Sequence, residues 1–565
     1  MPEGSKPIYG MTVDRSVHVK MRDGIRLACD VYRPDADGRF PALLSMSPFG
    51  KEIQLLNPPS QPRAKAEWGT LEAGHTEFWV SRGYVHVIND VRGSAGSEGH
   101  YDICQIKEQE DGYDLVEWIA QQPWCDGNVG MLGTSYIGFI QYLVAAQQPP
   151  HLKAIFPWDA WGDMYRDISH QGGILLHGWL PTFCTYLLGF NQMPASLEIY
   201  DKEELQRRIE KWKSNEVFNK HPEFYNALIY PQYKPTLFDW VINEFDGPYY
   251  WERSAHTKYD RIKIPTYLGS QMHSHQVSMH LPGAFTAWEG ITAPKKLAIR
   301  PGLVEVPFRE FHDEMLRWYD YWLKGIDTGI MEEPAMKIWV RGAEAWHYSD
   351  EWPLPETQWT NYYLSGSNRI TATPPTAEEA PDTFDHKPVL PLCRLSVPLD
   401  PLPDYLSYTT EPLDQDVLIM GPIALYLYAS ITGEDADFIV KVKDVAPDAS
   451  EFVLTRGWLK ASHRELDKNR SNPWQPYHPH LRAVPVEPGE VNEYVIEVMP
   501  IANLFKKGHK IKLEIWGCDY PLDKIDSILQ WPWRSHMSHE KEVSYKIHHS
   551  PNYPSRLLVP FVPGK

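Results

Sequence analysis

The sequence predicts an α/β core with a helical insertion, followed by an all-β C-terminal region. Up to about residue 158, short apolar runs alternate with helix-like segments. This alternation is typical of a parallel sheet covered by helices. Amphipathic, aromatic-rich segments replace it from 159 to 261, and strand-like runs separated by turn residues fill the chain beyond 346. Such runs predict a β-sandwich.

The first part of the core is expected to contain four buried strands and the helices between them. The strands are expected at 40–46, 84–90, 128–133 and 152–157. Each is a short apolar run bounded by turn residues. A helix is expected over 106–122, because Tyr113, Val116 and Ile119 lie on one side of it. A second helix is expected through 141–147.

The alternation resumes after the insertion, with strands expected at 264–269 and 295–299 and a helix near 309–324. An insertion between two strands of a parallel sheet covers the site at the strand ends, so we interpret it as a cap. The expected domains are therefore a core over 1–158 and 262–345, a helical cap over 159–261, and a jelly-roll β-sandwich over 346–565.

Composition restricts the classes of partner. The formal net charge is −19, which argues against a nucleic-acid partner, since phosphate binding needs clustered Lys and Arg. The six Cys are scattered without a CxxC pair, which predicts neither a disulfide framework nor a zinc site. With no signal peptide or membrane span visible in the sequence, we expect a cytoplasmic protein with a small-molecule substrate and no cofactor. A homo-oligomer is compatible with these features.

The segment with the clearest chemical signature runs from Gly133 to Gly138 and contains Ser135. It follows an expected strand and opens an expected helix. A sharp strand-to-helix turn lifts a serine hydroxyl out of the sheet and directs the first N–H groups of the helix toward a developing oxyanion. The usual spacing is G-x-S-x-G, whereas here Ile137 occupies the place of the second Gly. On spacing alone, a structural serine in a glycine-rich turn is an equally good interpretation.

Several further segments resemble one family. They are Trp124-Cys125-Asp126-Gly127-Asn128-Val129-Gly130, Met21-Arg22-Asp23-Gly24, Asp90-Val91-Arg92-Gly93, Asp111-Gly112-Tyr113-Asp114 and Leu454-Thr455-Arg456-Gly457-Trp458. Together with the Ser135 segment they resemble the cocaine esterase family, which also holds α-amino-acid ester hydrolases and X-Pro dipeptidyl peptidases. The resemblance covers nearly the whole chain. It implies an α/β-hydrolase core with a cap and a jelly roll, and it implies that Ser135 is the nucleophile.

The resemblance also implies a His and an Asp that activate the serine, and an oxyanion hole formed by the Tyr136 backbone N–H and a Tyr hydroxyl. This sequence departs from the pattern at three positions. Phe49 stands where the Tyr hydroxyl is expected, no Asp or Glu occurs between 264 and 288, and no His occurs in the loop that follows 295–299. Three departures together suggest a rewired triad or a different chemistry.

Four histidines are candidate replacements for the missing base: His273, His275, His280 and His312. His312 is the best substitute by sequence order, although a core-edge histidine bonded to a carbonyl is a good alternative. We predict His312 and His273 as catalytic, and His275, Phe49 and Trp161 as substrate-binding. A zinc site at His273, His275 and His280 is a weaker alternative, and no metal is predicted.

Three aspartates follow the last strand before the cap, namely Asp159, Asp163 and Asp167. One of them could orient the histidine, but capping of the first cap helix explains them as well.

These features predict a serine hydrolase that cleaves an ester or amide of a small to medium apolar acyl substrate through an acyl-enzyme on Ser135. Because three catalytic positions depart from the family, two alternatives stay open. One is a rewired site that carries out acyl transfer, a lyase step or a cyclisation in secondary metabolism. The other is a catalytically inactive relative that only binds a ligand.

Overall fold

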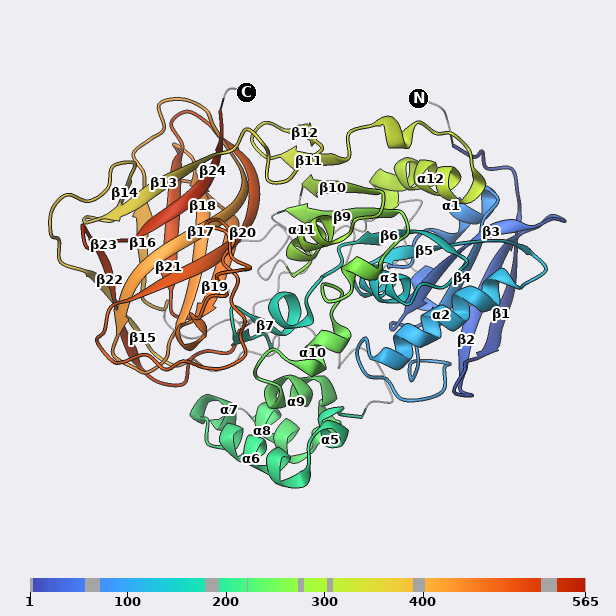
Figure 1. Ribbon diagram of the computed structural model, residues 1–565, viewed down its shortest axis with the longest axis horizontal. Helices are drawn as coiled ribbons and strands as arrows, with labels where there is room; N and C mark the ends of the chain where they lie inside the picture. Colours follow the sequence, from blue (N-terminus) through green and yellow to red (C-terminus); the bar gives the residue numbers. More distant parts are fainter. Residues whose placement is uncertain are drawn as a thin grey trace.

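The computed structural model describes residues 4–55, 72–177, 193–220, 222–272, 279–301, 308–389, 402–519 and 536–563 (Figure 1). His273 and His275 lie outside these residues. In the described part of the chain, no helix combines the length and the hydropathy that a membrane crossing requires.

One sheet of ten strands forms the N-terminal half of the molecule, in the order β1-β2-β4-β3-β5-β6-β9-β10-β11-β12. Its strands are β1 (Met11–Lys20), β2 (Arg26–Pro34), β3 (Phe40–Ser47), β4 (Val85–Asp90), β5 (Cys125–Thr134), β6 (Leu152–Trp158), β9 (Thr266–Met272), β10 (Lys295–Pro301), β11 (Met336–Val340) and β12 (Ala345–Ser349). The strands from β4 to β11 are parallel, while β1, β2 and β12 pair antiparallel at the two edges. The parallel strands β3, β4, β5, β6, β9 and β10 match the prediction, whereas β1, β2, β11 and β12 were not anticipated.

Helices cover both faces of this sheet, because strand side chains alternate between two apolar clusters. In β3, Leu44 packs into one cluster and Leu43 into the other. The first cluster contains residues of α2 (Ile106–Ala120), α3 (Tyr136–Ala146) and α11 (Leu281–Gly290), and the second contains residues of α1 (Thr76–Ser81) and α12 (Phe308–Lys324). The carboxyl ends of β5, β6 and β9 therefore lie at one edge, between two rigid layers.

A run of short helices joins β6 to β9 and lies below the sheet and the C-terminal domain in Figure 1. Its elements are the π-helix η2 (Met164–Ser169), the hairpin β7 (His170–Gln171) and β8 (Ile174–Leu175), and the helices α5 (Ser196–Ile199), α6 (Lys202–Lys213), α7 (Glu216–Lys220), α8 (Pro222–Ile229), α9 (Pro235–Ile242) and α10 (Pro248–Arg253). These segments occupy the range predicted as the cap; the exact domain boundaries stay predictions.

The C-terminal region is all β, as predicted. Its strands are β13 (Gln358–Ser365), β14 (Arg369–Thr371), β15 (Asp382–His386), β16 (Tyr405–Thr409), β17 (Val417–Ile431), β18 (Asp437–Val445), β19 (Glu451–Lys460), β20 (Asn492–Phe505), β21 (Lys510–Trp516), β22 (Val543–Ser550), β23 (Tyr553–Pro554) and β24 (Arg556–Val562). Hydrogen-bonded ladders follow the order β17-β20-β19-β18-β21-β16-β14-β13-β24, and β24 pairs with β17 again. The ring closes into a barrel around its own apolar core.

Candidate active site

Ser135 occupies a strained turn between β5 and α3. Its backbone torsions are φ 57° and ψ −122°, a region that non-glycine residues rarely adopt and that is often found at functional sites. Gly133 has φ +150°, and a Cβ there would lie 2.2 Å from the Ile137 side chain. A Cβ at Gly138 would lie 2.4 Å from the carbonyl oxygen of Trp158. The displaced second glycine is thus required by the close approach of α3 to the end of β6.

The histidine that faces Ser135 is His280. Its Nε2 lies 3.4 Å from the Ser135 Oγ, within hydrogen-bonding distance. His280 directly precedes α11, and its ring stacks with that of Trp161 at a centroid distance of 6.2 Å. The sequence placed His280 among four candidates without preferring it, because nothing in its spacing separates it from its neighbours.

The backbone N–H of Tyr136, the predicted oxyanion donor, lies at the start of α3. Tyr136 is the first residue of α3, so the helix itself does not use this N–H, and the helix dipole favours negative charge there. The Tyr136 side chain is fixed separately, because its hydroxyl donates to Glu108 at 2.7 Å. Burial raises the pKa of Glu108 to about 8. The Phe49 ring meets the Tyr136 ring edge-on at 6.4 Å. Phe49 therefore contacts the side chain of the residue after Ser135, without the hydroxyl that the resemblance implies.

His312 occupies a different environment from His280. Its ring stacks on Phe78 at 4.1 Å and meets the His75 ring edge-on at 6.2 Å, within the layer formed by α1 and α12. Burial lowers the pKa of His312 to about 3, which keeps the ring neutral at physiological pH. His312 thus keeps the aromatic contacts of a core histidine, and the assignment of His312 as catalytic base stays an untested prediction.

Trp161 is the predicted substrate-binding residue that the structure brings closest to these groups. It is 1% exposed and stacks on Phe139 at 4.6 Å, with its edge toward Tyr136 at 6.2 Å. Trp161 therefore contacts both the histidine and the residue after the serine. Its position is compatible with the predicted role, which the contacts alone do not test.

Two carboxyl groups lie at the same edge of the sheet. Asp159 follows β6 with φ +46°, and its Oδ1 accepts a hydrogen bond from the Ser270 Oγ at 3.1 Å. Burial raises the pKa of Asp159 to about 6, although Arg300 opposes the shift. Burial also raises the pKa of Glu72 to about 8, and the nearby Asp159 adds to that effect. Glu72 precedes α1 in a loop without any motif, so sequence reasoning missed it.

Asp163 and Asp167 hold the first turn of the cap instead. Asp163 Oδ1 accepts from the backbone N–H groups of Tyr165 and Arg166, at 2.8 and 3.1 Å, and thereby caps η2. Asp167 Oδ2 accepts from the backbone N–H groups of Gly162 and Asp163. Among the described residues, no three His, Cys, Asp or Glu side chains come together as a metal site.

The strand order and the serine turn define an α/β-hydrolase. Comparison with known proteins identifies the family within this class. Residues 23–303 match the family model described as X-Pro dipeptidyl-peptidase (S15 family), and residues 328–558 match the X-Pro dipeptidyl-peptidase C-terminal non-catalytic domain. A protein named cocaine esterase from Rhodococcus sp. (strain MB1 Bresler) is 28% identical over 600 residues, which cover 98% of this chain and 99% of that protein.

Solved structures share the fold. A CocE/NonD family hydrolase from Staphylococcus aureus aligns with a TM-score of 0.78 at 23% identity, over 98% of this chain and 94% of that one. An α-amino acid ester hydrolase aligns with a TM-score of 0.76 at 18% identity, over 99% and 98% of the two chains.

The chain belongs to the family of the cocaine esterase and the X-Pro dipeptidyl-peptidases. The family predicted from the sequence motifs is thus confirmed, and the chain is an esterase or related hydrolase of the serine type. The comparisons do not favour a non-hydrolytic or purely ligand-binding role.

Proposed function

We propose that this protein hydrolyses esters of small to medium apolar acyl groups through an acyl-enzyme on Ser135, with His280 as general base. The observation that carries the proposal is the 3.4 Å approach of His280 Nε2 to the Ser135 Oγ, at a turn whose backbone is strained. A serine and a histidine at this distance, beside the N-terminus of a helix, have the geometry that nucleophilic catalysis requires.

In the proposed reaction, the Ser135 Oγ attacks the acyl carbon and the His280 Nε2 takes the hydroxyl proton. The Tyr136 N–H and the N-terminus of α3 stabilise the negative charge on the tetrahedral intermediate. The intermediate collapses, and the leaving alkoxide takes the proton from His280. Water then attacks the acyl-enzyme and gives a proton to His280. The bond between the acyl carbon and the Ser135 Oγ breaks, the acid leaves, and His280 returns the proton to the Ser135 Oγ.

An ester is the preferred substrate class because the oxyanion hole lacks a second donor at Phe49. Losing one such donor typically costs about 2.7–4 kcal/mol of transition-state stabilisation. Esters are intrinsically more reactive toward a serine nucleophile than amides, so an ester tolerates this loss better. The name of the cocaine esterase relative supports the same class. The aromatic rings of Phe49 and Trp161 suit an apolar acyl group.

The experiment is fluorophosphonate labelling of the purified protein, with Ser135→Ala, His280→Ala and His312→Ala as variants. The labelled residue is located by peptide mass spectrometry. Hydrolysis of p-nitrophenyl acetate, butyrate and octanoate is measured alongside, together with hydrolysis of an X-Pro anilide.

The proposal expects labelling at Ser135, strong loss of labelling in Ser135→Ala and His280→Ala, and retention in His312→Ala. Labelling that survives His280→Ala but is lost in a folded His312→Ala would instead assign the base to His312. Absence of labelling in the wild type would overturn the proposal that Ser135 is an activated nucleophile. Faster cleavage of the anilide than of every ester would overturn the ester preference.

A further inference from the structure

A pocket lies where the segment around α10 meets the loop between β19 and β20. Its volume is about 370 Å³. The cap contributes Asp246, Trp251, His256 and Thr257, and the C-terminal domain contributes Asp467, Arg470, Tyr477, Pro479 and Leu481. Neither Ser135 nor His280 nor Trp161 lines it. The pocket therefore belongs to a different part of the molecule from the proposed acyl site.

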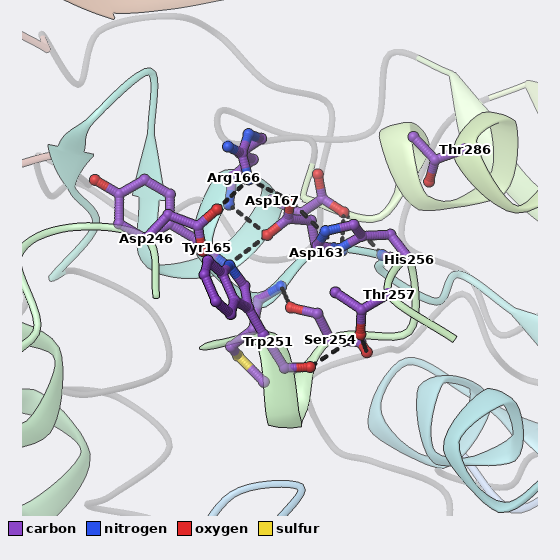
Figure 2. Close-up of polar contacts among 12 residues, drawn as sticks. Asp163, Tyr165, Arg166, Asp167, Asp246, Trp251, Ser254, His256, Thr257 and Thr286 are labelled. Atoms are coloured by element: carbon purple, nitrogen blue, oxygen red, sulfur yellow. Dashed lines mark hydrogen bonds and ion pairs between the residues drawn. The ribbon is translucent and has the colours of Figure 1, made fainter. Parts of the chain in front are cut away.

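The wall behind the pocket is a rigid ionic network (Figure 2). Arg166 Nη1 donates to Asp163 Oδ2 and to Asp246 Oδ2, both at 2.8 Å. Its Nη2 donates to the carbonyl oxygens of His478 and Pro479, at 2.9 and 3.0 Å. His256 Nδ1 lies 3.4 Å from Asp163 Oδ2. Arg166 thus fixes Asp246 of the cap against the loop of the C-terminal domain.

The carboxylate of Asp246 is buried, and its hydrogen bonding is incomplete. Its side chain is only 4% exposed, and Arg166 occupies one carboxylate oxygen. Among the described residues, the other oxygen, Oδ1, has no hydrogen-bond partner. Burial raises the pKa of Asp246, while Arg166 and the Trp251 indole oppose that shift. A buried carboxylate oxygen left without a partner is costly, so a cationic ligand placed there would be stabilised.

Asp467 provides a second carboxylate in the lining. Its Oδ1 accepts from the backbone N–H of Asn469 at 3.0 Å, and none of the ion pairs among the described residues includes it. The cation in the lining, Arg470, stacks on the Tyr477 ring at 3.6 Å. The carboxylates of the pocket therefore have capacity to bind a further positive group.

The mouth of the pocket is apolar. Trp251 is 43% exposed and Leu481 is 56% exposed. Tyr477 already interacts with Arg470 and, at 4.5 Å, with Arg166. The indole of Trp251 is therefore the aromatic surface that stays available to a ligand, and indoles are the best aromatic partners of ammonium groups.

We propose that this pocket binds an organic ammonium ion that carries an apolar group. The carboxylates of Asp246 and Asp467 hold the ammonium, and Trp251 and Leu481 cover the apolar part. The site is independent of the Ser135 chemistry, so its test does not rely on catalytic activity.

The test is isothermal titration of the full-length protein with three probes of similar shape: 2-phenylethylammonium, the neutral 2-phenylethanol and the anionic 3-phenylpropionate. The expected result is saturable binding of one ammonium ion, at least about tenfold tighter than the binding of either other probe. Equal affinity for the alcohol, tighter binding of the anion, or no saturable binding of the ammonium would overturn the proposal.

Variants localise the binding. Asp467→Asn and Trp251→Ala alter exposed or half-buried side chains and are expected to fold, and each should weaken ammonium binding by about tenfold. Asp246→Asn should weaken it further if the variant folds. The matched control is Asp37→Asn, an exposed carboxylate in the turn between β2 and β3, which should leave binding unchanged. Unchanged binding in both Asp467→Asn and Trp251→Ala would place the ammonium elsewhere and refute the site.

Discussion

Asp159 and Asp163 are four residues apart, are both buried, and have pKa values that shift in opposite directions. Asp159 lies at the sheet edge near Ser135, where burial raises its pKa to about 6 against the opposing effect of Arg300. Asp163 lies at the cap junction, where burial also disfavours its charge, but His256 and Arg166 outweigh burial and lower its pKa to about 2. The sheet edge near Ser135 thus holds a weakly compensated carboxyl, whereas Asp163 at the cap junction is paired with His256 and Arg166. At the same junction burial raises the pKa of Asp246, and that of Asp167 to about 8, so the contrast is between Asp159 and Asp163 themselves.

This difference separates two uses of buried polar groups. Perturbed carboxyls such as Asp159 and Glu72 accumulate near functional sites, while a fully bonded ion pair such as Arg166 with Asp163 holds elements together. Substitutions of Ser135 and His280 at the sheet edge should therefore reduce rate and spare stability. Substitutions at the cap junction should do the reverse.

The largest expected effect is on the rate of Ser135→Ala. Removing the nucleophile should reduce kcat/KM for p-nitrophenyl esters by at least about 10⁴-fold, as in other serine hydrolases. The melting temperature should stay close to that of the wild type, since no large apolar contact is lost. A folded Ser135→Ala that keeps more than a tenth of the activity would show that the strained turn is not the reactive centre.

The second effect contrasts His280→Ala with His312→Ala. Loss of the proposed base should lower kcat by about 10²–10⁴-fold with little change in stability. Loss of the ring stacked on Phe78 should destabilise the fold by about 2–3 kcal/mol with little change in kcat. Steady-state kinetics and urea unfolding on both variants measure kcat and the free energy of unfolding. A large loss of kcat in His312→Ala with little change in His280→Ala would assign the base to His312 in α12.

The third effect tests the cap junction through Arg166→Met. Removing this guanidinium leaves Asp163 and Asp246 buried without their cation, which should cost about 3–5 kcal/mol of folding free energy. The kcat on p-nitrophenyl acetate should change less than fivefold, about 1 kcal/mol, at temperatures where the variant is folded. A variant with unchanged stability and abolished activity would contradict the division between the two regions.

A smaller effect is expected from Phe49→Tyr. If this position lies beside the oxyanion, a restored hydroxyl should raise kcat by about tenfold or more, since one donor is worth about 2.7–4 kcal/mol at best. The control is Phe49→Leu, which keeps an apolar side chain and supplies no donor. Equal rates for Phe49→Tyr and the wild type would place the Phe49 ring away from the reacting oxygen.

The last effect concerns the pH dependence of stability and involves the two aspartates. The raised pKa of Asp159 means that its contribution to stability is present below its ordinary pKa and is lost as pH rises through about 6. The difference in unfolding free energy between the wild type and Asp159→Asn should therefore fall by up to about 3 kcal/mol between pH 4 and 7. For Asp163→Asn the sign is opposite. The lowered pKa of Asp163 means that its charged form stabilises the fold above the ordinary pKa of an aspartate, and this contribution is lost as the pH falls toward 2. Urea unfolding at several pH values measures both differences, and equal slopes would refute the comparison.

Most of the fold was predictable, because strand and helix periodicity depend on local side-chain pattern. The runs at 40–46 and 152–157 correspond to β3 and β6, and the helix expected at 106–122 corresponds to α2. The core strands β11 and β12 were missed. The N-terminal strands β1 and β2 were missed as well. They form an antiparallel edge pair, and β1 is largely exposed, so it carries no continuous apolar run.

The site was predictable only where the backbone itself is unusual. The serine turn depends on glycines whose absence of a side chain is visible in the sequence, so the turn drew attention to Ser135. The family resemblance implied the role of Tyr136, and both assignments stay predictions. His280 and Glu72 were not singled out, because their positions depend on how β9, α1 and α11 pack. His312 was preferred because it follows β10 in sequence order, yet its aromatic contacts are with Phe78 and His75.

The most direct test of the account is the mass of a trapped acyl-enzyme. The protein is mixed rapidly with p-nitrophenyl butyrate, quenched in acid within milliseconds, and digested for peptide mass spectrometry. The account predicts a burst of p-nitrophenolate equal to the enzyme concentration and a butyryl group on Ser135, with both absent in Ser135→Ala. Turnover of the ester with neither a burst nor an acyl group on Ser135 in the quenched samples, and with Ser135→Ala still active, would contradict the acyl-enzyme mechanism.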